Sequence, residues 1–370
     1  MSPTYLKGVV AGFLALVLVT GAGCTPTGTT SIAPAVGPTG MFRSDDNGEK
    51  WREVNTLSGK VPASLNKIKV YRAFNDPSDP NALYITSRGQ GLFFTYDVGE
   101  TWQTTEALKN RFIYSVAVNF KDKCTIYATD GTSIMKTTDC TRTWKTVYAH
   151  QIPSDKIVSV AIDYGNPQLL YAAIRASATQ SGTILVSADG GDSWQSIKRL
   201  PFEVENLTSD PLVPRRVYVA GYEQGLVRSD DAGVTWKDLR KPLEKYTDAK
   251  KFFRIVTHPT KKDTLFWVSK YGILRSEDAG VTWKELSLIT APGSVNIYTF
   301  ALDPTNESNL FYTGTTLDEN NQHVRSTFYR STDGGKSWVT KKLPTNTIPI
   351  SLYVHPSGNG TILMGFTVTD

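Results

Sequence analysis

The sequence predicts an all-β fold, because one short motif and one strand pattern recur along its 370 residues. The motif is close to Ser/Thr-x-Asp-x-Gly-x-Ser/Thr-Trp. Its seven copies end at Trp51, Trp102, Trp144, Trp194, Trp236, Trp283 and Trp338. The copies are 42 to 55 residues apart, a period typical of four-stranded propeller blades. We therefore predict a seven-bladed β-propeller of four-stranded antiparallel blades.

Each repeat supplies four strands joined by recognisable turns. Before most motifs, an apolar strand leads into a Pro turn such as Asp76-Pro77, and a second apolar strand follows. Pro belongs in the turn because it lacks the N–H that a sheet needs. The first motif has no strand pair before it, whereas 348–370 ends the chain with a pair and no motif. We therefore expect strands in 348–370 to pair with strands in 41–54, which closes the ring and removes exposed edges.

The motif has a structural explanation. Its hydroxyl and carboxylate can accept hydrogen bonds from N–H groups of a tight turn, and its Gly allows a positive φ. Its Trp can bury a large ring against the neighbouring unit. We interpret the seven motif aspartates as structural and not catalytic. They are Asp46, Asp97, Asp139, Asp189, Asp231, Asp278 and Asp333.

These motifs resemble the Asp-box, or BNR repeat, of sialidases, sortilin-type receptors and photosystem II stability/assembly factor-like propellers. Over residues 40–370 the chain is most similar to the last group. That resemblance implies a non-catalytic, membrane-tethered propeller that binds a partner protein as an assembly scaffold. The alternative is a carbohydrate-binding or sialidase-like glycoside-hydrolase propeller. Xyloglucanase-type enzymes share the boxes, but they place two propellers around a cleft.

The N-terminus predicts export. Residues 1–23 combine Lys7, an apolar run and small residues before Cys24, as in a signal peptide. The segment resembles a bacterial lipoprotein signal with Cys24 as the acylated residue, although Gly21 departs from that pattern. A plain secretory signal and an uncleaved anchor are the alternatives. Residues 24–39 are predicted to be a flexible tether, which would hold the propeller at the cell surface or in the periplasm.

Two further cysteines, Cys124 and Cys140, flank the strands of the third repeat, whose motif has Thr141 in place of Gly. They should lie at the same end of one blade, and exported proteins can keep disulfides. A disulfide between them and two buried free thiols are both compatible with the sequence.

The loops between successive blades are basic, with fifteen Lys and Arg against five Asp and Glu. The loops between blades, and those between the second and third strands of a blade, are expected on the face opposite the Pro turns and motif turns. This basic loop face would attract an acidic protein segment or another anionic partner, or it could simply be a solvated surface. Nucleic acid is not expected for an exported protein, and we expect a monomer.

The inner strands carry a polar residue at one shared register, while the next residue on the same side is mostly small. The polar set is Arg72, Ser115, Ser159, Asn206, Arg254, Thr299 and Ser351. Either these groups line a wet channel, or Arg72, Arg254 and Asn206 form the floor of a binding site beneath the basic loops. The nearest acid on a neighbouring inner strand is Glu205. The predicted partner-binding residues are Arg72, Arg111, Asn206, Arg254, Lys198, Arg199, Arg240, Lys241 and Lys251.

No catalytic or cofactor signature appears in the sequence. The four histidines are scattered, and no metal-ligand spacing, nucleophile elbow or phosphate loop is present. The segment Phe253-Arg254-Ile255-Val256 comes close to the sialidase Phe-Arg-Ile-Pro motif, but it lies late in the chain and lacks the Pro. The sequence therefore predicts no cofactor, no metal and no enzymatic activity.

Overall fold

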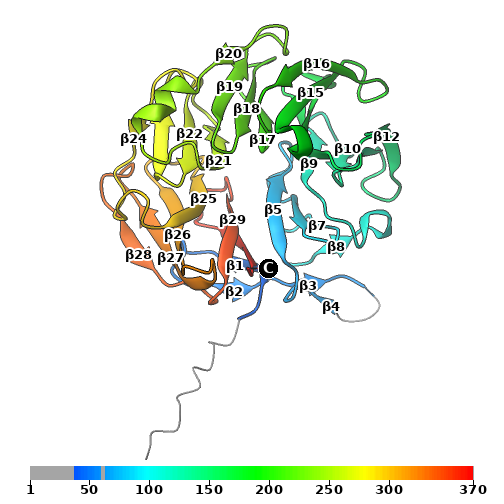
Figure 1. Cartoon of the computed structure of the whole chain (residues 1–370). Helices are drawn as coiled ribbons and strands as arrows, with labels where there is room; N and C mark the ends of the chain where they lie inside the picture. The colour runs from blue at the N-terminus through cyan, green and yellow to red at the C-terminus, as the bar shows by residue number, and fades with distance from the viewer. Residues whose placement is uncertain (1–36, 60–62, 370) are drawn as a thin grey trace, which may run out of the picture. The chain divides into compact units, whose positions relative to one another are not determined.

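Each repeat of the sequence forms one four-stranded antiparallel sheet. The computed structural model describes residues 37–59 and 63–369. In these residues seven such sheets stand as blades around one axis, so the fold class and the blade number are confirmed (Figure 1). The predicted signal peptide, Cys24 and most of the predicted tether lie outside the described residues. No helix within 37–59 and 63–369 is long and apolar enough to cross a membrane.

Six blades are built from four consecutive strands each, and the first strand of each blade is the innermost. The first two are β5 (Val70–Asn75), β6 (Leu83–Ser87), β7 (Leu92–Thr95), β8 (Gln103–Thr104), and β9 (Ser115–Asn119), β10 (Asp122–Thr129), β11 (Ser133–Thr137), β12 (Lys145–Ala149). The next two are β13 (Lys156–Asp163), β14 (Asn166–Ala176), β15 (Ser181–Ser187), β16 (Gln195–Leu200), and β17 (Asn206–Ser209), β18 (Val217–Gly221), β19 (Gly225–Ser229), β20 (Lys237–Asp238). The last two are β21 (Phe252–Thr257), β22 (Leu265–Ser269), β23 (Ile273–Ser276), β24 (Lys284–Glu285), and β25 (Asn296–Leu302), β26 (Leu310–Leu317), β27 (His323–Ser331), β28 (Val339–Lys341).

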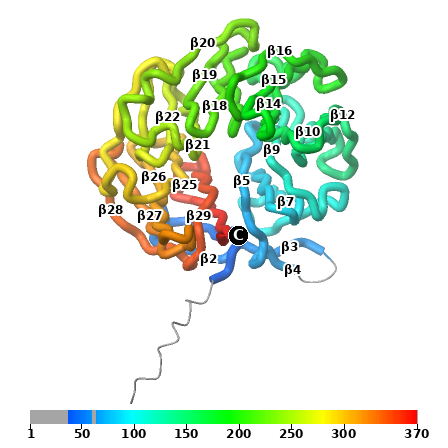
Figure 2. Tube along the Cα trace, viewed as in Figure 1, coloured from blue at the N-terminus to red at the C-terminus, as the bar shows by residue number. Residues whose placement is uncertain are grey.

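The seventh blade is shared between the two ends of the propeller, as predicted. Its order is β29 (Ile348–Val354), β30 (Ile362–Thr367), β1 (Gly40–Ser44) and β2 (Arg52–Glu53). Strand β1 pairs with β30 from Gly40 opposite Phe366 to Ser44 opposite Ile362. The chain trace shows this meeting of its first and last strands (Figure 2). The chain ends therefore depend on each other for their sheet hydrogen bonds.

Short elements decorate the loops between blades. A two-stranded sheet of β3 (Thr56–Leu57) and β4 (Ala63–Ser64) follows the shared blade. Three 3-10 helices complete the secondary structure: η1 (Glu106–Leu108), η2 (Ser177–Thr179) and η3 (Lys241–Lys245). Strand β3 also forms an isolated parallel bridge from Leu57 to Trp102. The Trp102 side chain is fully buried and donates its indole N–H to Val54 O at 2.6 Å. This motif Trp therefore joins its blade to the shared blade, the packing expected from the sequence.

The motif turns have the hydrogen bonds that their residue types predict. In the copy at 276–283, Ser276 Oγ accepts from the N–H of Gly280 at 2.8 Å and donates to Asp278 Oδ1. Asp278 Oδ1 also accepts from the N–H of Thr282 at 2.8 Å. Gly280 has φ +91°, so it requires the left-handed region. The corresponding aspartates of all seven motif turns accept such bonds, which supports their structural role.

One further backbone bond joins the motif turn to the turn between the first two strands of the same blade. In each blade the residue directly after the motif Asp donates to that turn or to the start of the strand that follows it, as Ala279 N–H does to Asp263 O at 2.8 Å. The other six donors are Asn47, Val98, Cys140, Gly190, Ala232 and Gly334. Both sets of turns therefore lie on one face, the turn face. On the opposite face, the loops between blades contact the hairpins between the second and third strands, as in the bond from Gly91 N–H to Arg111 O.

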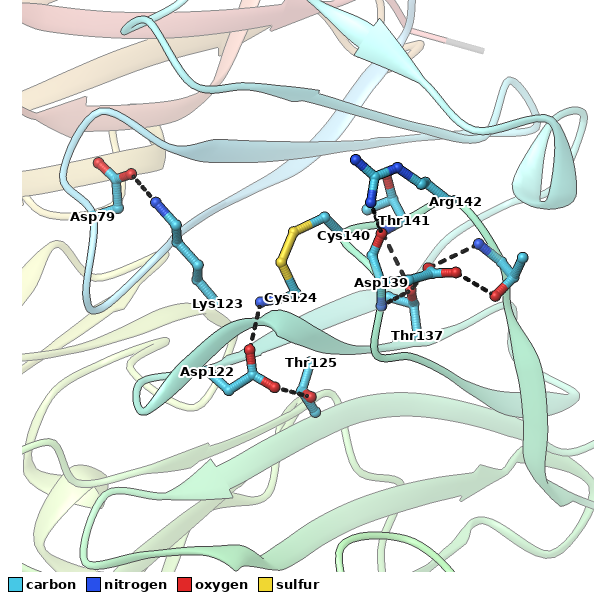
Figure 3. Close-up of a disulfide and its surroundings, with 11 residues drawn as sticks. Asp79, Asp122, Lys123, Cys124, Thr125, Thr137, Asp139, Cys140, Thr141 and Arg142 are labelled. Atoms are coloured by element: carbon cyan, nitrogen blue, oxygen red, sulfur yellow. Dashed lines mark hydrogen bonds and ion pairs between the residues drawn. A yellow bond between two sulfur atoms is a disulfide. The ribbon is translucent and has the colours of Figure 1, made fainter.

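In one blade a disulfide also links the two segments that the backbone bond of the motif turn joins. Cys140 N–H donates to Cys124 O at 3.3 Å, and the two side chains form a disulfide (Figure 3). Cys124 lies within β10 and not before it, a small difference from the sequence expectation. Beside it, Thr141 occupies the Gly position with φ +73°, which is unfavourable for a β-branched residue. The covalent link therefore lies next to the one motif turn that lacks Gly.

Candidate functional site

A cavity of about 460 Å³ runs along the propeller axis and is lined by all seven inner strands. The residues that the sequence placed two positions after the polar register all face it. They are Phe74, Ala117, Ala161, Thr208, Val256, Ala301 and Tyr353. The inner strands thus present one mostly apolar ring to this axial cavity, as period-two alternation requires.

The polar register does not form a single ring, which corrects the sequence expectation. Arg72, Ser115, Asn206 and Arg254 line the axial cavity, whereas Ser159, Thr299 and Ser351 are buried beside it and do not. Ser159 Oγ instead accepts from Leu207 N–H of the next blade at 3.1 Å. Thr299 Oγ1 likewise bonds to Thr313 Oγ1 of the adjacent strand at 2.8 Å, whereas Ser351 Oγ is buried without a hydrogen-bond partner among the described residues.

The two arginines reach across the axis to backbone carbonyls of other blades. Arg72 in β5 donates from Nη2 to Glu205 O at 3.3 Å, three blades further round the ring. Arg254 in β21 donates from Nη2 to Ile350 O at 2.9 Å. Burial, and then the charge of Arg72, lower the pKa of Arg254 from 12.5 to about 10. The two guanidinium groups are therefore close enough to repel each other, and Arg254 remains charged at neutral pH.

The carboxylate of Glu205 does not neutralise either arginine. It pairs instead with Arg175 of β14, at 2.7 Å between Oε1 and Nη1. The described residues that line the axial cavity include no Asp, Glu or His. The positive charge at this end of the cavity therefore has no acidic partner within the described residues.

The axial cavity opens on the turn face, whereas the sequence predicted a binding site beneath the basic loops. Its lining extends from Arg72 and Arg254 to Pro77, Phe120 and Tyr164 near the Pro turns. Pro77 is exposed, and the rings of Phe120 and Tyr164 stack with centroids 5.8 Å apart. No described residue of the loops between blades contributes to the lining. The arginines thus form the inner end of a cavity whose mouth lies on the opposite face.

The basic loop face contains both paired and unpaired charges. Six of its described bases form ion pairs with carboxylates: Lys109, Arg111, Arg240, Lys250, Lys251 and Lys341. The partner of Arg111 is Asp130, in a hairpin loop that the sequence count left out. Lys198, Arg199 and Lys241 have no ion-pair partner among the described residues. Lys67, Lys156, Lys245 and Lys342 of this face also lack an ion-pair partner within residues 37–59 and 63–369, so four of the seven unpaired bases lie in β16 or η3 and three lie elsewhere.

An aromatic cluster on the same face was missed by the sequence reasoning. Phe112 and Tyr114 stack with ring centroids 4.2 Å apart, and Tyr71 contacts Phe112 edge-on at 4.9 Å. The guanidinium of Arg72 lies 5.1 Å from the Tyr71 ring. The signal was the aromatic residue immediately before the polar register in two adjacent blades, Tyr71 and Tyr114.

Two of the histidines, His258 and His355, act as turn residues directly before Pro259 and Pro356. His258 Nδ1 accepts from the N–H groups of Thr260 and Lys261, and His355 Nδ1 accepts from Ser357 N–H. Within the described residues no group of three His, Cys, Asp or Glu side chains could hold a metal ion. The described residues therefore provide a cavity lined by two arginines and a basic loop face, and among them no metal-ligand cluster is found.

Comparison with known sequences finds two kinds of relative and no matching family model. The chain is 28% identical over 164 residues to the xyloglucanase Xgh74A of Acetivibrio thermocellus, which is 44% of this chain and 16% of that protein. It is 24% identical over 246 residues to the vacuolar protein sorting/targeting protein 10 of Emericella nidulans, or 60% of this chain and 16% of that protein. The chain thus spans about one sixth of each relative.

Solved structures share the propeller architecture at low sequence identity. A GH74 xyloglucanase from Xanthomonas campestris matches with a TM-score of 0.64 and 16% identity, over 86% of this chain and 52% of that one. YCF48 bound to D1 peptide matches with a TM-score of 0.57 and 15% identity, over 82% and 93%. YCF48 from Cyanidioschyzon merolae matches at 0.58 and 13%, over 81% and 96%. The fold is a seven-bladed β-propeller. Its neighbours include both glycosidases and YCF48, so fold alone leaves enzymatic activity open.

Proposed function

We propose that this chain is a non-catalytic propeller that binds an acidic protein partner through its basic loop face. The observation that carries the non-catalytic part of this proposal is the composition of the axial cavity, whose described lining has two arginines and no carboxylate. Glycoside hydrolysis needs two carboxylates on either side of the scissile bond. The axial cavity is therefore suited to binding and not to hydrolysis.

The loop face supports the choice of an acidic partner. Lys198 and Arg199 lie near the end of β16, and in the loop that follows, the ring of Phe202 lies 5.7 Å from the Arg240 guanidinium next to η3. Together with Lys241 they give a local excess of positive charge, which attracts an acidic segment and accelerates its association.

The likeness to YCF48 supports a scaffold role. The chain matches YCF48 over nearly the whole of that propeller, whereas it covers about half of the GH74 xyloglucanase. One YCF48 structure has a D1 peptide bound. We extend to this chain the binding of a protein segment. From the sequence we also propose that the motif turns are Asp-boxes, that the chain is exported, and that a lipid on Cys24 attaches it to a membrane.

The test uses the mature chain from Cys24 onward and a fluorescent oligo-glutamate peptide. We expect Lys198→Glu, Arg199→Glu and Lys241→Glu together to weaken binding about tenfold or more, and added salt to weaken binding to the native protein. A matched variant reverses three exposed charges away from this face, at Lys145, Lys284 and Lys336. Equal losses in both variants would mean that only net charge matters, and the proposed face would be rejected.

The xyloglucanase relatives support one second candidate, a glycan-binding or glycan-cleaving propeller. Incubation with xyloglucan followed by a reducing-sugar assay tests cleavage, and affinity electrophoresis in xyloglucan gels tests binding. Under the scaffold proposal the protein releases no reducing sugar and migrates as it does in a gel without the polysaccharide. Release or retardation would replace the scaffold proposal with this one.

A further inference from the structure

The inner end of the axial cavity contains two cations and lacks their counter-charge. Arg72 and Arg254 each donate one hydrogen bond to a backbone carbonyl, although a guanidinium has five N–H donors. Arg254 Nε is shielded from solvent and has no hydrogen-bond partner among the described residues. Buried charges are normally paired, so a shielded N–H donor on one of two neighbouring guanidinium groups needs an explanation.

The wall above the arginines is apolar and leads to an open mouth. Ala117, Val256 and Ala301 face the cavity on different blades, and Phe74 and Tyr353 add aromatic surface. The stacked rings of Phe120 and Tyr164 stand at the turn face. A ligand that enters here meets an apolar passage first and a positive inner end second.

We propose that the axial cavity binds a carboxylate attached to an apolar body. The carboxylate faces Arg72 and Arg254, and the body lies against the inner-strand wall toward the turn face. The ligand could be a free carboxylic acid or the carboxyl end of an extended polypeptide, since both present this chemistry.

The donors favour a carboxylate over a larger anion. A guanidinium matches the two oxygens of a carboxylate with parallel N–H bonds, and Asn206 adds an amide at the same register. The cavity volume of about 460 Å³ lies in the range of small-molecule sites. A multiply charged phosphate would find only two cations and an apolar wall.

This site is independent of the proposed scaffold function. The axial cavity opens on the turn face, whereas the acidic partner is assigned to the loop face. Reversal of Lys198, Arg199 and Lys241 should therefore leave carboxylate binding intact. Either proposal can fail without the other.

Isothermal titration calorimetry with 3-phenylpropionate tests the inference, with the uncharged amide 3-phenylpropanamide as the ligand control. We expect the acid to bind and the amide to bind at least about tenfold more weakly, the usual effect of losing a charge-assisted hydrogen bond. Arg254→Gln and Arg72→Gln should each weaken binding of the acid about tenfold or more. Arg325→Gln, an exposed site on β27 far from the inner strands, should change it less than about twofold.

A third variant keeps the test informative if an arginine variant fails to fold. Ala117→Leu fills the cavity wall without altering charge, and it should abolish binding of 3-phenylpropionate while the melting temperature changes little. A short apolar peptide with a free or an amidated C-terminus distinguishes the two sources of the carboxylate. The tighter of the free acid and the peptide acid identifies the natural class.

Three results would overturn the inference. They are equal binding of 3-phenylpropionate and its amide, unchanged binding in the folded Arg254→Gln or Ala117→Leu variant, and inorganic phosphate binding as tightly as the acid. Absence of any heat of binding at millimolar 3-phenylpropionate, with no response to the peptide acid, would also reject it.

Discussion

Replacing Phe366 with alanine tests whether the shared blade holds the propeller together. Phe366 in β30 is fully buried, and its ring meets that of Phe42 in β1 edge-on with centroids 5.3 Å apart. This contact therefore joins the last strand of the chain to the first. Truncating a buried Phe to Ala typically costs about 3–5 kcal/mol, through lost burial and a residual cavity. That is a large part of the stability of an ordinary domain, about 5–15 kcal/mol.

Urea unfolding followed by circular dichroism measures the effect. We expect Phe366→Ala to lower the free energy of unfolding by about 3–5 kcal/mol in a single transition. Val339→Ala, at a side chain that is 53% exposed on the edge strand β28, should change it by less than about 0.5 kcal/mol. Deletion of 357–370 removes all of β30 and should unfold the whole ring. A truncated protein that melts cooperatively at the native temperature would refute the reasoning.

Three further predictions concern export, the disulfide and acid stability. If Cys24 is acylated, Cys24→Ala should move the protein from the membrane fraction to the soluble fraction, as followed by immunoblotting after fractionation. Cys124→Ser with Cys140→Ser should lower the free energy of unfolding by up to about 3 kcal/mol, because the closed loop is short, with a sequence separation of 16. Hydrogen bonds from Thr143 and then Thr137 lower the pKa of Asp139 from 3.8 to about 2. Between pH 3.8 and about 2 Asp139 therefore binds more protons in the unfolded state than in the folded state, so the urea midpoint should fall as the pH drops through this range.

The sequence predicted the ring and its closure because both depend on local rules. Each motif turn uses a hydroxyl and a carboxylate within a few residues of each other, and all but the one at Thr141 use a Gly, so the residue types alone imply the geometry. The missing strand pair before Ser44 and the surplus pair after 348 indicated the shared blade directly. Period-two alternation likewise predicted that Ala117 and Val256 face the axis.

The tertiary structure decided where the charges of the site point. Arg72 lies 133 residues from Glu205, and whether it meets the carboxylate or the carbonyl of that residue depends on rotamers and on Arg175. The opening of the axial cavity toward the turn face is likewise set by how far long side chains reach across the axis. A register counts positions along a strand, but it contains no information about side-chain length, direction or competing partners. For this reason the sequence determined the architecture, and only the packed blades determined the site.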